Sequence, residues 1–169
     1  MSSKVRGATI FREETIRGKE KSAVTEVNKV VIRYKDGRVA KGTTHDFVPG
    51  KEAFHFEPAG INGVREVKIR DLKAVFFVKD FAGRSDYSET KLFPVKPLAS
   101  KGRKIAVLFK DGELLTGYTL AYDPRRPGFF VMPTDEMSNN ERVFVIASAI
   151  EEVGMGIKAD KILRENLRA

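Results

Sequence analysis

The 169-residue sequence contains no cysteine and no tryptophan, and it has only two histidines. Without cysteine the chain can form neither disulfides nor thiolate metal sites, and it has no cysteine nucleophile. A small protein of this kind must be stabilised by packing or by self-association. The hydrophobic content of 41% is sufficient for a core in one ordinary domain or in two small ones.

Long apolar runs are also missing. No stretch of the sequence reaches the roughly 18 consecutive apolar residues of a membrane helix. The N-terminal segment MSSKVRGATIF lacks the continuous apolar run of a secretory signal. We therefore expect a cytoplasmic protein with no membrane partner.

Groups suited to catalysis are few. The two histidines, His45 and His55, have no carboxylate at a spacing that marks a catalytic pair. Two lone histidines also make a poor metal site. Asp36 and Asp111 each stand directly before a glycine, a position typical of turns. The sequence therefore predicts a protein that is not an enzyme and that holds no cofactor or metal.

The net charge is +8, and the positive charge is unevenly distributed. Acidic and basic residues interleave along most of the chain, as on a solvated surface. The segment 90–104 differs, because it contains Lys91, Lys96, Lys101, Arg103 and Lys104 and no acid. Such a run is typical of a soluble linker, and it also favours contact with a polyanion.

An internal repeat is visible when the sequence is compared with itself, because 30–58 aligns with 105–133 without a gap. Identical residues fall at eight positions: Lys35, Asp36, Gly37, Gly42, Thr44, Pro49, Phe54 and Pro58 align with Lys110, Asp111, Gly112, Gly117, Thr119, Pro124, Phe129 and Pro133. Beyond this stretch the alignment needs a one-residue adjustment between positions 59 and 72. The sequence therefore predicts two copies of one unit.

Each copy is a series of short strands. It begins with VVIRYKDG or IAVLFKDG, where an Asp-Gly pair between two β-rich runs favours a hairpin turn. In the next strand, Gly42 or Gly117 allows a sharp bend or a close approach of a neighbouring backbone. Strong curvature is what a small barrel requires. We therefore expect a mainly all-β fold, with two tandem small, strongly bent antiparallel β-barrel-like repeats.

The expected domain organisation follows from the repeat. The apolar residues after Lys158 have helical spacing, which predicts a short amphipathic helix at the C-terminus. The segments are a polar extension (1–28), a first repeat (29–82), a basic linker (83–103), a second repeat (104–154) and the C-terminal helix (155–169).

Two strands are apolar on both faces. In LKAVFFV, Phe76 and Phe77 point to opposite sides of the strand, and Phe129 and Phe130 do the same in the second copy. A small barrel has only one inner face, so the second apolar face needs a cover. These four phenylalanines are therefore candidate interface residues, whose cover is either the other repeat or another subunit.

The apolar strand, the Lys-Asp-Gly turn and the glycine five residues later resemble the first signature of Sm-like proteins, which are small SH3-like barrels. Ile69-Arg70 is similar to their second signature, but Asp71 stands where the family has glycine, and the second copy has Ile146-Ala147. The resemblance implies a bent five-stranded barrel of a class that typically assembles in rings and binds RNA. The segments KAVFFVKDF and GFFVMPTDEMSNNERVFVI also look like an uncharacterised bacterial family with this tandem arrangement.

A weaker resemblance concerns receptors of the PilZ type, which are small β-barrels that bind cyclic dinucleotides. Asp86-Tyr87-Ser88 resembles the start of their aspartate-x-serine signature. Lys91 replaces its final glycine, and Arg65 and Arg70 are one residue too far apart for the arginine pair.

Three hypotheses for function follow. The first is a non-enzymatic module that binds nucleic acid, RNA above all, through basic residues in loops: Lys51, Lys101, Arg103, Lys104, Arg125 and Arg126. The second is a module for protein interaction or assembly into a homo-oligomer, which pairs the doubly apolar strands. The third is the cyclic-dinucleotide receptor.

Overall fold

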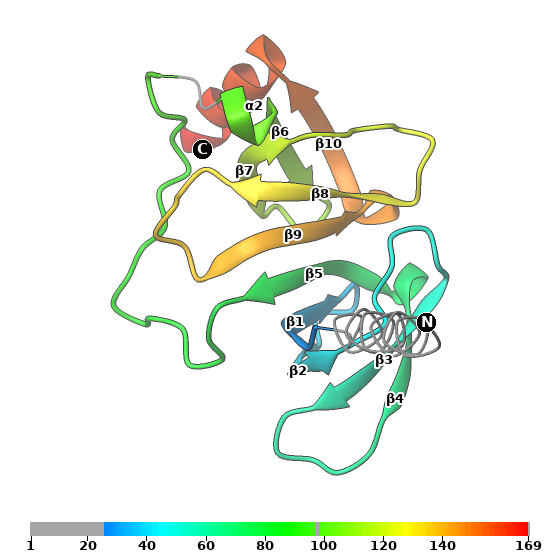
Figure 1. The fold of residues 1–169 in the computed structure, drawn as a ribbon. Coiled ribbons are helices and arrows are strands. Elements are labelled where there is room, and N and C mark those ends of the chain that lie inside the picture. The colour runs from blue at the N-terminus through cyan, green and yellow to red at the C-terminus, as the bar shows by residue number, and fades with distance from the viewer. Residues whose placement is uncertain (1–25, 97–98, 169) are drawn as a thin grey trace, which may run out of the picture.

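Ten strands form a single antiparallel sheet in the computed structural model, which describes residues 26–96 and 99–168 (Figure 1). In chain order they are β1 (Asn28–Tyr34), β2 (Val39–Thr44), β3 (Ala53–Pro58), β4 (Arg65–Lys68), β5 (Leu72–Val78), β6 (Arg103–Phe109), β7 (Leu114–Thr119), β8 (Gly128–Pro133), β9 (Asn140–Ile146) and β10 (Ile150–Met155). Their order across the sheet is β10-β6-β7-β8-β9-β5-β1-β2-β3-β4. We call β1–β5 the first half, β6–β10 the second half, and the β5–β9 pair between them the seam.

Short helices separate some of the strands. The 3-10 helices η1 (Ile69–Asp71), η2 (Ala99–Lys101) and η3 (Ala147–Ala149) precede β5, β6 and β10, and the helix α2 (Ile157–Leu167) follows β10. The predicted predominance of β-structure and the C-terminal helix are therefore confirmed. Two separately closed barrels are not found, because the sheet continues from one half to the other and leaves β4 and β10 as its edges.

Glycine positions explain two local features of each half. Gly37 and Gly112 have positive φ angles of 92° and 88°, as the predicted Asp-Gly turns require. A Cβ atom at Gly42 would lie 2.1 Å from the carbonyl oxygen of Glu57, and one at Gly117 would lie 2.2 Å from that of Met132. The predicted close approach of a neighbouring backbone is therefore confirmed at both positions.

The strands of the two halves pair in the same register. Val30 is opposite Gly42 and Phe77, as Ile105 is opposite Gly117 and Met155. Phe54 is opposite Val67, as Phe129 is opposite Val145. The alignment read from the sequence therefore holds through the third strand of each half. The predicted one-residue adjustment was wrong, because Phe129 and its partner Val145 are three positions further apart in sequence than Phe54 and its partner Val67.

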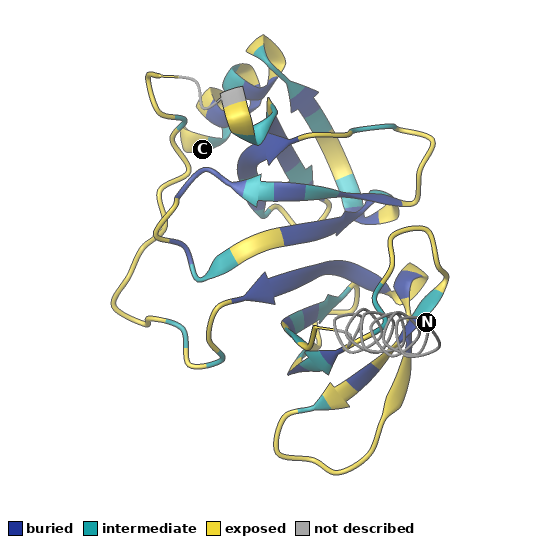
Figure 2. Cartoon of the chain, in the orientation of Figure 1, coloured by how far each residue is buried: buried dark blue, intermediate teal, exposed yellow. Residues whose placement is uncertain are grey.

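The two apolar cores share strands across the seam. Phe144 and Ile146 of β9 belong to the core of the first half, and Ala74, Phe76 and Val78 of β5 belong to the core of the second half. Figure 2 shows β5 buried along its length. Each half therefore depends on a strand of the other to complete its core.

A third apolar cluster lies under α2, which packs on β6, β7 and β10. Its buried members are Ala106, Leu114, Ala159, Ile162 and Leu163. No helix among the described residues has the length and apolar character needed to cross a membrane.

The connection between β5 and β6, predicted as a basic linker, is bound to the second half over part of its length. Asp135 accepts hydrogen bonds from the Tyr87 hydroxyl at 2.6 Å and from the backbone N–H of Thr90 at 2.9 Å. The Thr116 hydroxyl donates to the carbonyl oxygen of Lys91 at 2.7 Å. These hydrogen bonds therefore fix part of the connection against the second half, and one of them comes from Tyr87 of the Asp86-Tyr87-Ser88 motif.

Candidate ligand-binding site at the seam

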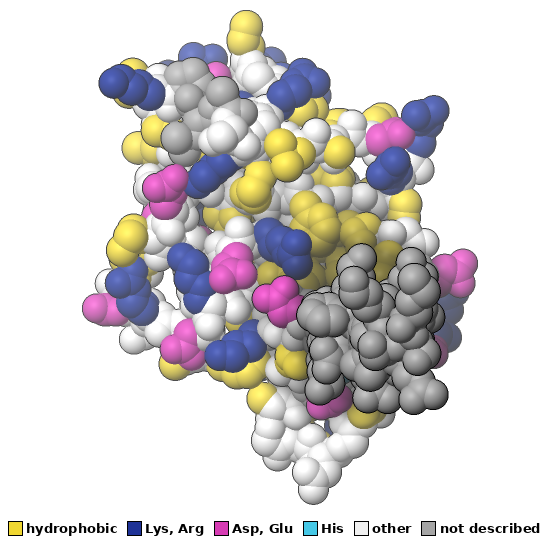
Figure 3. Space-filling model, in the orientation of Figure 1, with side chains coloured by type: hydrophobic (Ala, Val, Ile, Leu, Met, Phe, Trp, Pro, Cys, Tyr) yellow, Lys and Arg dark blue, Asp and Glu magenta, His cyan; other side chains and the backbone are white. Residues whose placement is uncertain are grey.

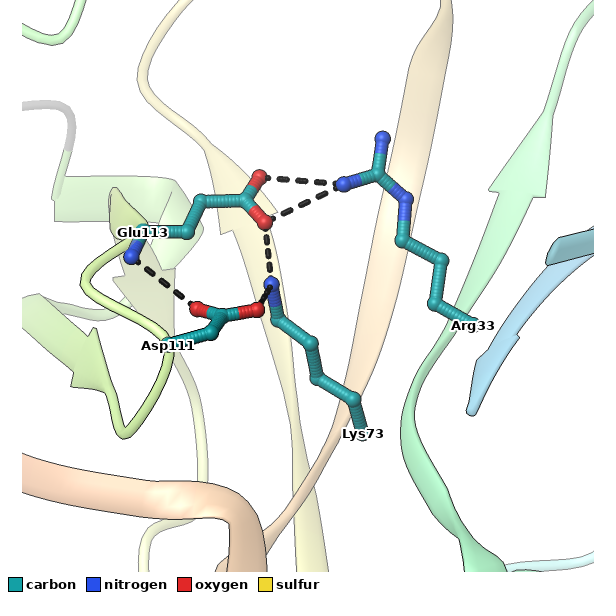
Figure 4. Close-up of polar contacts among 4 residues, drawn as sticks. All are labelled: Arg33, Lys73, Asp111 and Glu113. Carbon is teal, nitrogen blue, oxygen red and sulfur yellow. Dashed lines mark hydrogen bonds and ion pairs between the residues drawn. The ribbon is translucent and has the colours of Figure 1, made fainter. Parts of the chain in front are cut away.

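An ion network crosses the seam (Figure 4). Lys73 of β5 is nearly buried, with its side chain 7% exposed, and its ammonium lies 2.6 Å from an Asp111 carboxylate oxygen and is also paired with Glu113. Arg33 of β1 pairs with the same Glu113 at 3.1 Å. The hydrogen bond from Lys73 lowers the pKa of the Asp111 carboxyl group. Since each charge has a partner, we interpret this network as a link between the halves.

The same network shows a second role for Asp111. Its other carboxylate oxygen accepts a hydrogen bond from the backbone N–H of Glu113 at 3.0 Å, as the predicted turn residue should. Nothing in the sequence indicated its contact with Lys73. The only signal was a single charged residue within the apolar segment LKAVFFV. A buried ammonium requires a nearby anion, which predicts a partner but not its identity.

Both histidines have carboxylate partners, contrary to the expectation from spacing. His55 Nδ1 lies 2.6 Å from Asp46 Oδ2, and His45 Nε2 lies 3.1 Å from Glu57 Oε1. The hydrogen bond with Asp46 raises the pKa of His55, and the same bond lowers the pKa of Asp46. The charged pair is therefore lost as pH rises through the raised pKa of His55. Both histidines are exposed, and neither ring forms a hydrogen bond with a hydroxyl group of the described residues, so we interpret these as surface ion pairs.

A groove of about 630 Å³ opens where η1 and η3 meet across the seam. We call it the seam groove. It is lined by Gly50, Lys51, Glu52, Ala53, Glu66, Lys68, Ile69, Arg70, Pro127, Ile146, Ala147 and Ser148. Its apolar lining comes from both halves. Its charged residues all come from the first half, and three of the five are basic.

A second hollow of about 410 Å³ adjoins the seam groove, because Ser148 lines both. We call it the turn pocket. It is lined by Lys35, Lys73, Phe109, Lys110, Asp111, Ser148 and Ala149. Taken together, the two hollows are lined by six basic residues and three acidic ones, so the net formal charge of their lining is +3.

The basic residues predicted to bind nucleic acid are dispersed. Lys101 pairs with Glu136 at 2.8 Å, and Lys104 pairs with Asp160 at 3.1 Å. Arg125 pairs with its neighbour Asp123 at 2.8 Å.

The other three predicted basic residues have no ion-pair partner among the described residues. Arg103 and Arg126 are exposed and form no ion pair with the described residues. Lys51 lies in the seam groove, and Arg126 directly precedes Pro127 of its lining. On the face shown in Figure 3, Lys and Arg side chains are interspersed with Asp and Glu and form no separate patch. Lys35, Lys68 and Lys110 were not predicted, and Arg70 was noted only in the resemblances to the second Sm signature and to the PilZ arginine pair.

The candidate interface residues lie inside the chain. Phe76, Phe77 and Phe129 are at most 6% exposed. Phe130 is partly buried against the core of the first half, with its ring centroid 5.1 Å from that of Phe144. The cover that the second apolar face requires is therefore the other half of the same chain.

Residues 26–156 match the model of a protein family. No curated protein and no solved structure matches the chain.

Proposed function

The chain belongs to that family, described as a family of unknown function (DUF6982), and we propose from its own residues that it is a non-enzymatic module binding single-stranded nucleic acid, RNA in the first instance. The proposed site is the seam groove. We also propose a cytoplasmic location, where RNA is available. The observation that carries the proposal is the excess of basic side chains in two adjoining hollows.

The cations of the groove are available to a ligand. Lys51 and Lys68 form no ion pair with the described residues, and Arg70 has only a 3.9 Å contact with Asp71. These side chains can neutralise phosphates, which supply most of the affinity in non-specific nucleic-acid binding. Accessible apolar residues of the lining, namely exposed Pro127 and half-buried Ala53 and Ala147, offer a surface for bases.

Single strands fit this site better than duplexes. The groove is a recess between two halves, whereas a duplex presents its phosphates on a broad convex surface. Recognition of single strands combines a basic groove along the backbone with contacts to unstacked bases. Glu52 and Glu66 of the lining can accept hydrogen bonds from base amino groups.

The matched registers support a related proposal about the fold. We propose that the halves are tandem copies of one small, strongly bent barrel-like unit, as the resemblance to Sm-like and SH3-like proteins implies. In this view the copies are joined where β5 pairs with β9. Assembly through the doubly apolar strands has less support, because Phe76, Phe77 and Phe129 are covered within the chain.

Binding to a labelled single-stranded RNA of about ten nucleotides, within the usual range of site sizes, tests the proposal. We expect the affinity to fall as salt increases. A plot of the logarithm of the binding constant against the logarithm of the salt concentration should have a slope of about −0.7 for each phosphate contact. Three to five contacts would give a slope of about −2 to −3.5. Fluorescence anisotropy across a salt series measures it. Absence of binding at low salt, or affinity independent of salt, would refute the proposed function.

A further inference from the structure

The ammonium group of Lys35 is fixed at the boundary between the two hollows. Lys35 follows β1, and its Nζ donates to the Arg70 carbonyl oxygen at 2.7 Å and to the Ser148 hydroxyl oxygen at 2.6 Å. These acceptors belong to η1 and η3, which lie on opposite sides of the seam. The position of the positive charge is therefore set by both halves.

The charge of Lys35 is not neutralised by the groups that hold it. Both acceptors are neutral oxygens, and Lys35 forms no ion pair with any described residue. An ammonium group has three donors, and two of them are in use. The third donor of this exposed residue remains for an anion.

The turn pocket contains a second lysine, Lys110, which is the repeat equivalent of Lys35. Lys110 stands at the position in the second half that Lys35 has in the first. Its backbone N–H donates to the Ala149 carbonyl oxygen at 3.0 Å, as that of Lys35 does to Asp71. The side chain of Lys110 is exposed and forms no ion pair with the described residues. Lys73 adds no available charge, because Asp111 and Glu113 already bind it.

Basic side chains thus line both hollows: Lys51, Lys68 and Arg70 the seam groove, and Lys35 and Lys110 the turn pocket. We propose that Lys35 binds a phosphate group where the two hollows adjoin and that the ligand continues from the seam groove into the turn pocket. The ligand is then an extended strand with several successive phosphates, not a free nucleotide. This inference rests on the proposed function.

The test compares two probes and four substitutions, one of which is a control. The probes are a nucleoside monophosphate and a single-stranded RNA of about ten nucleotides. Lys35→Met and Lys110→Met remove the charge and keep an apolar chain of similar length, while Lys35→Arg keeps the charge. Lys161→Met on α2 is the matched control, because this lysine is 67% exposed and lies outside both hollows.

We expect the RNA to bind far more tightly than the monophosphate. Lys35→Met and Lys110→Met should each weaken RNA binding about fivefold at low salt and reduce the salt slope by about 0.7. Lys35→Arg should restore most of the affinity, and Lys161→Met should change little. A merely structural role of Lys35 would lower thermal stability without changing the salt slope.

Two results would overturn the inference while the proposed function stands. One is RNA binding by the wild-type protein with an unchanged salt slope in both methionine variants. The other is a monophosphate affinity equal to that of the RNA. Failure of the wild-type protein to bind any RNA would refute the proposed function itself.

Discussion

Replacing Phe144 by alanine is expected to destabilise the whole protein by about 3–5 kcal/mol, the usual effect of truncating a buried phenylalanine. Phe144 is 1% exposed, and its ring centroid lies 5.1 Å from those of Phe47 and of Phe130. Although β9 belongs to the second half, this ring completes the core of the first half. The loss of packing should therefore affect both halves together.

Urea unfolding of the wild-type protein and of Phe144→Ala measures this effect. We expect one transition for each protein, with coincident curves from circular dichroism and from amide signals in each half, as two-state unfolding requires. Leu167→Ala is the control, because this side chain is 56% exposed and should change stability by less than about 0.5 kcal/mol. Separate transitions for the two halves would contradict the shared cores.

Replacing the basic residues that line the seam groove should have the largest effect on binding. The variant carries Lys51→Gln, Lys68→Gln and Arg70→Gln, and these residues form only one ion contact with the described residues, at 3.9 Å. Each lost phosphate contact should cost up to about 1 kcal/mol of binding free energy. Three lost contacts together should therefore reduce the RNA affinity at low salt by about 100-fold. The salt slope should fall by about 2.

The control is a variant with the same change in net charge on α2 and the residue that follows it: Lys161→Gln, Arg164→Gln and Arg168→Gln. These residues are exposed and lie outside both hollows. We expect its affinity to change by no more than a few-fold, because the Debye length at physiological salt is only about 8 Å. Equal losses in the two variants would mean that net charge, and not the groove, determines binding.

Much of the secondary structure was predictable because its determinants are local. The Asp-Gly turns and the close approaches at Gly42 and Gly117 follow from the steric properties of glycine, and the structure confirms them. The continuity of the sheet was not predictable in the same way. The alternating apolar residues around Phe76 and Phe77 show that both faces are covered, but periodicity does not identify the strand that pairs with them.

The site was harder to predict because it is formed by segments far apart in sequence. Lys51 was predicted from its loop, whereas Lys35 and Arg70 become part of a site only where η1 meets η3. Conversely, Lys101 and Lys104 belong to the most basic stretch of the chain, but each meets an acid from a distant part of the sequence. A run of basic residues in the sequence therefore does not show which charges can bind a ligand. That depends on the ion pairs that these residues form in the folded chain.

Mapping of the bound RNA by NMR tests the central claim most directly. Addition of a single-stranded RNA of about ten nucleotides to labelled protein should shift amide signals of the seam groove and the turn pocket, including those of Lys51, Arg70 and Ser148. Signals of α2 should stay unchanged. Shifts confined to surfaces away from both hollows, such as α2 or the start of β6, would contradict the account, as would a spectrum that does not change.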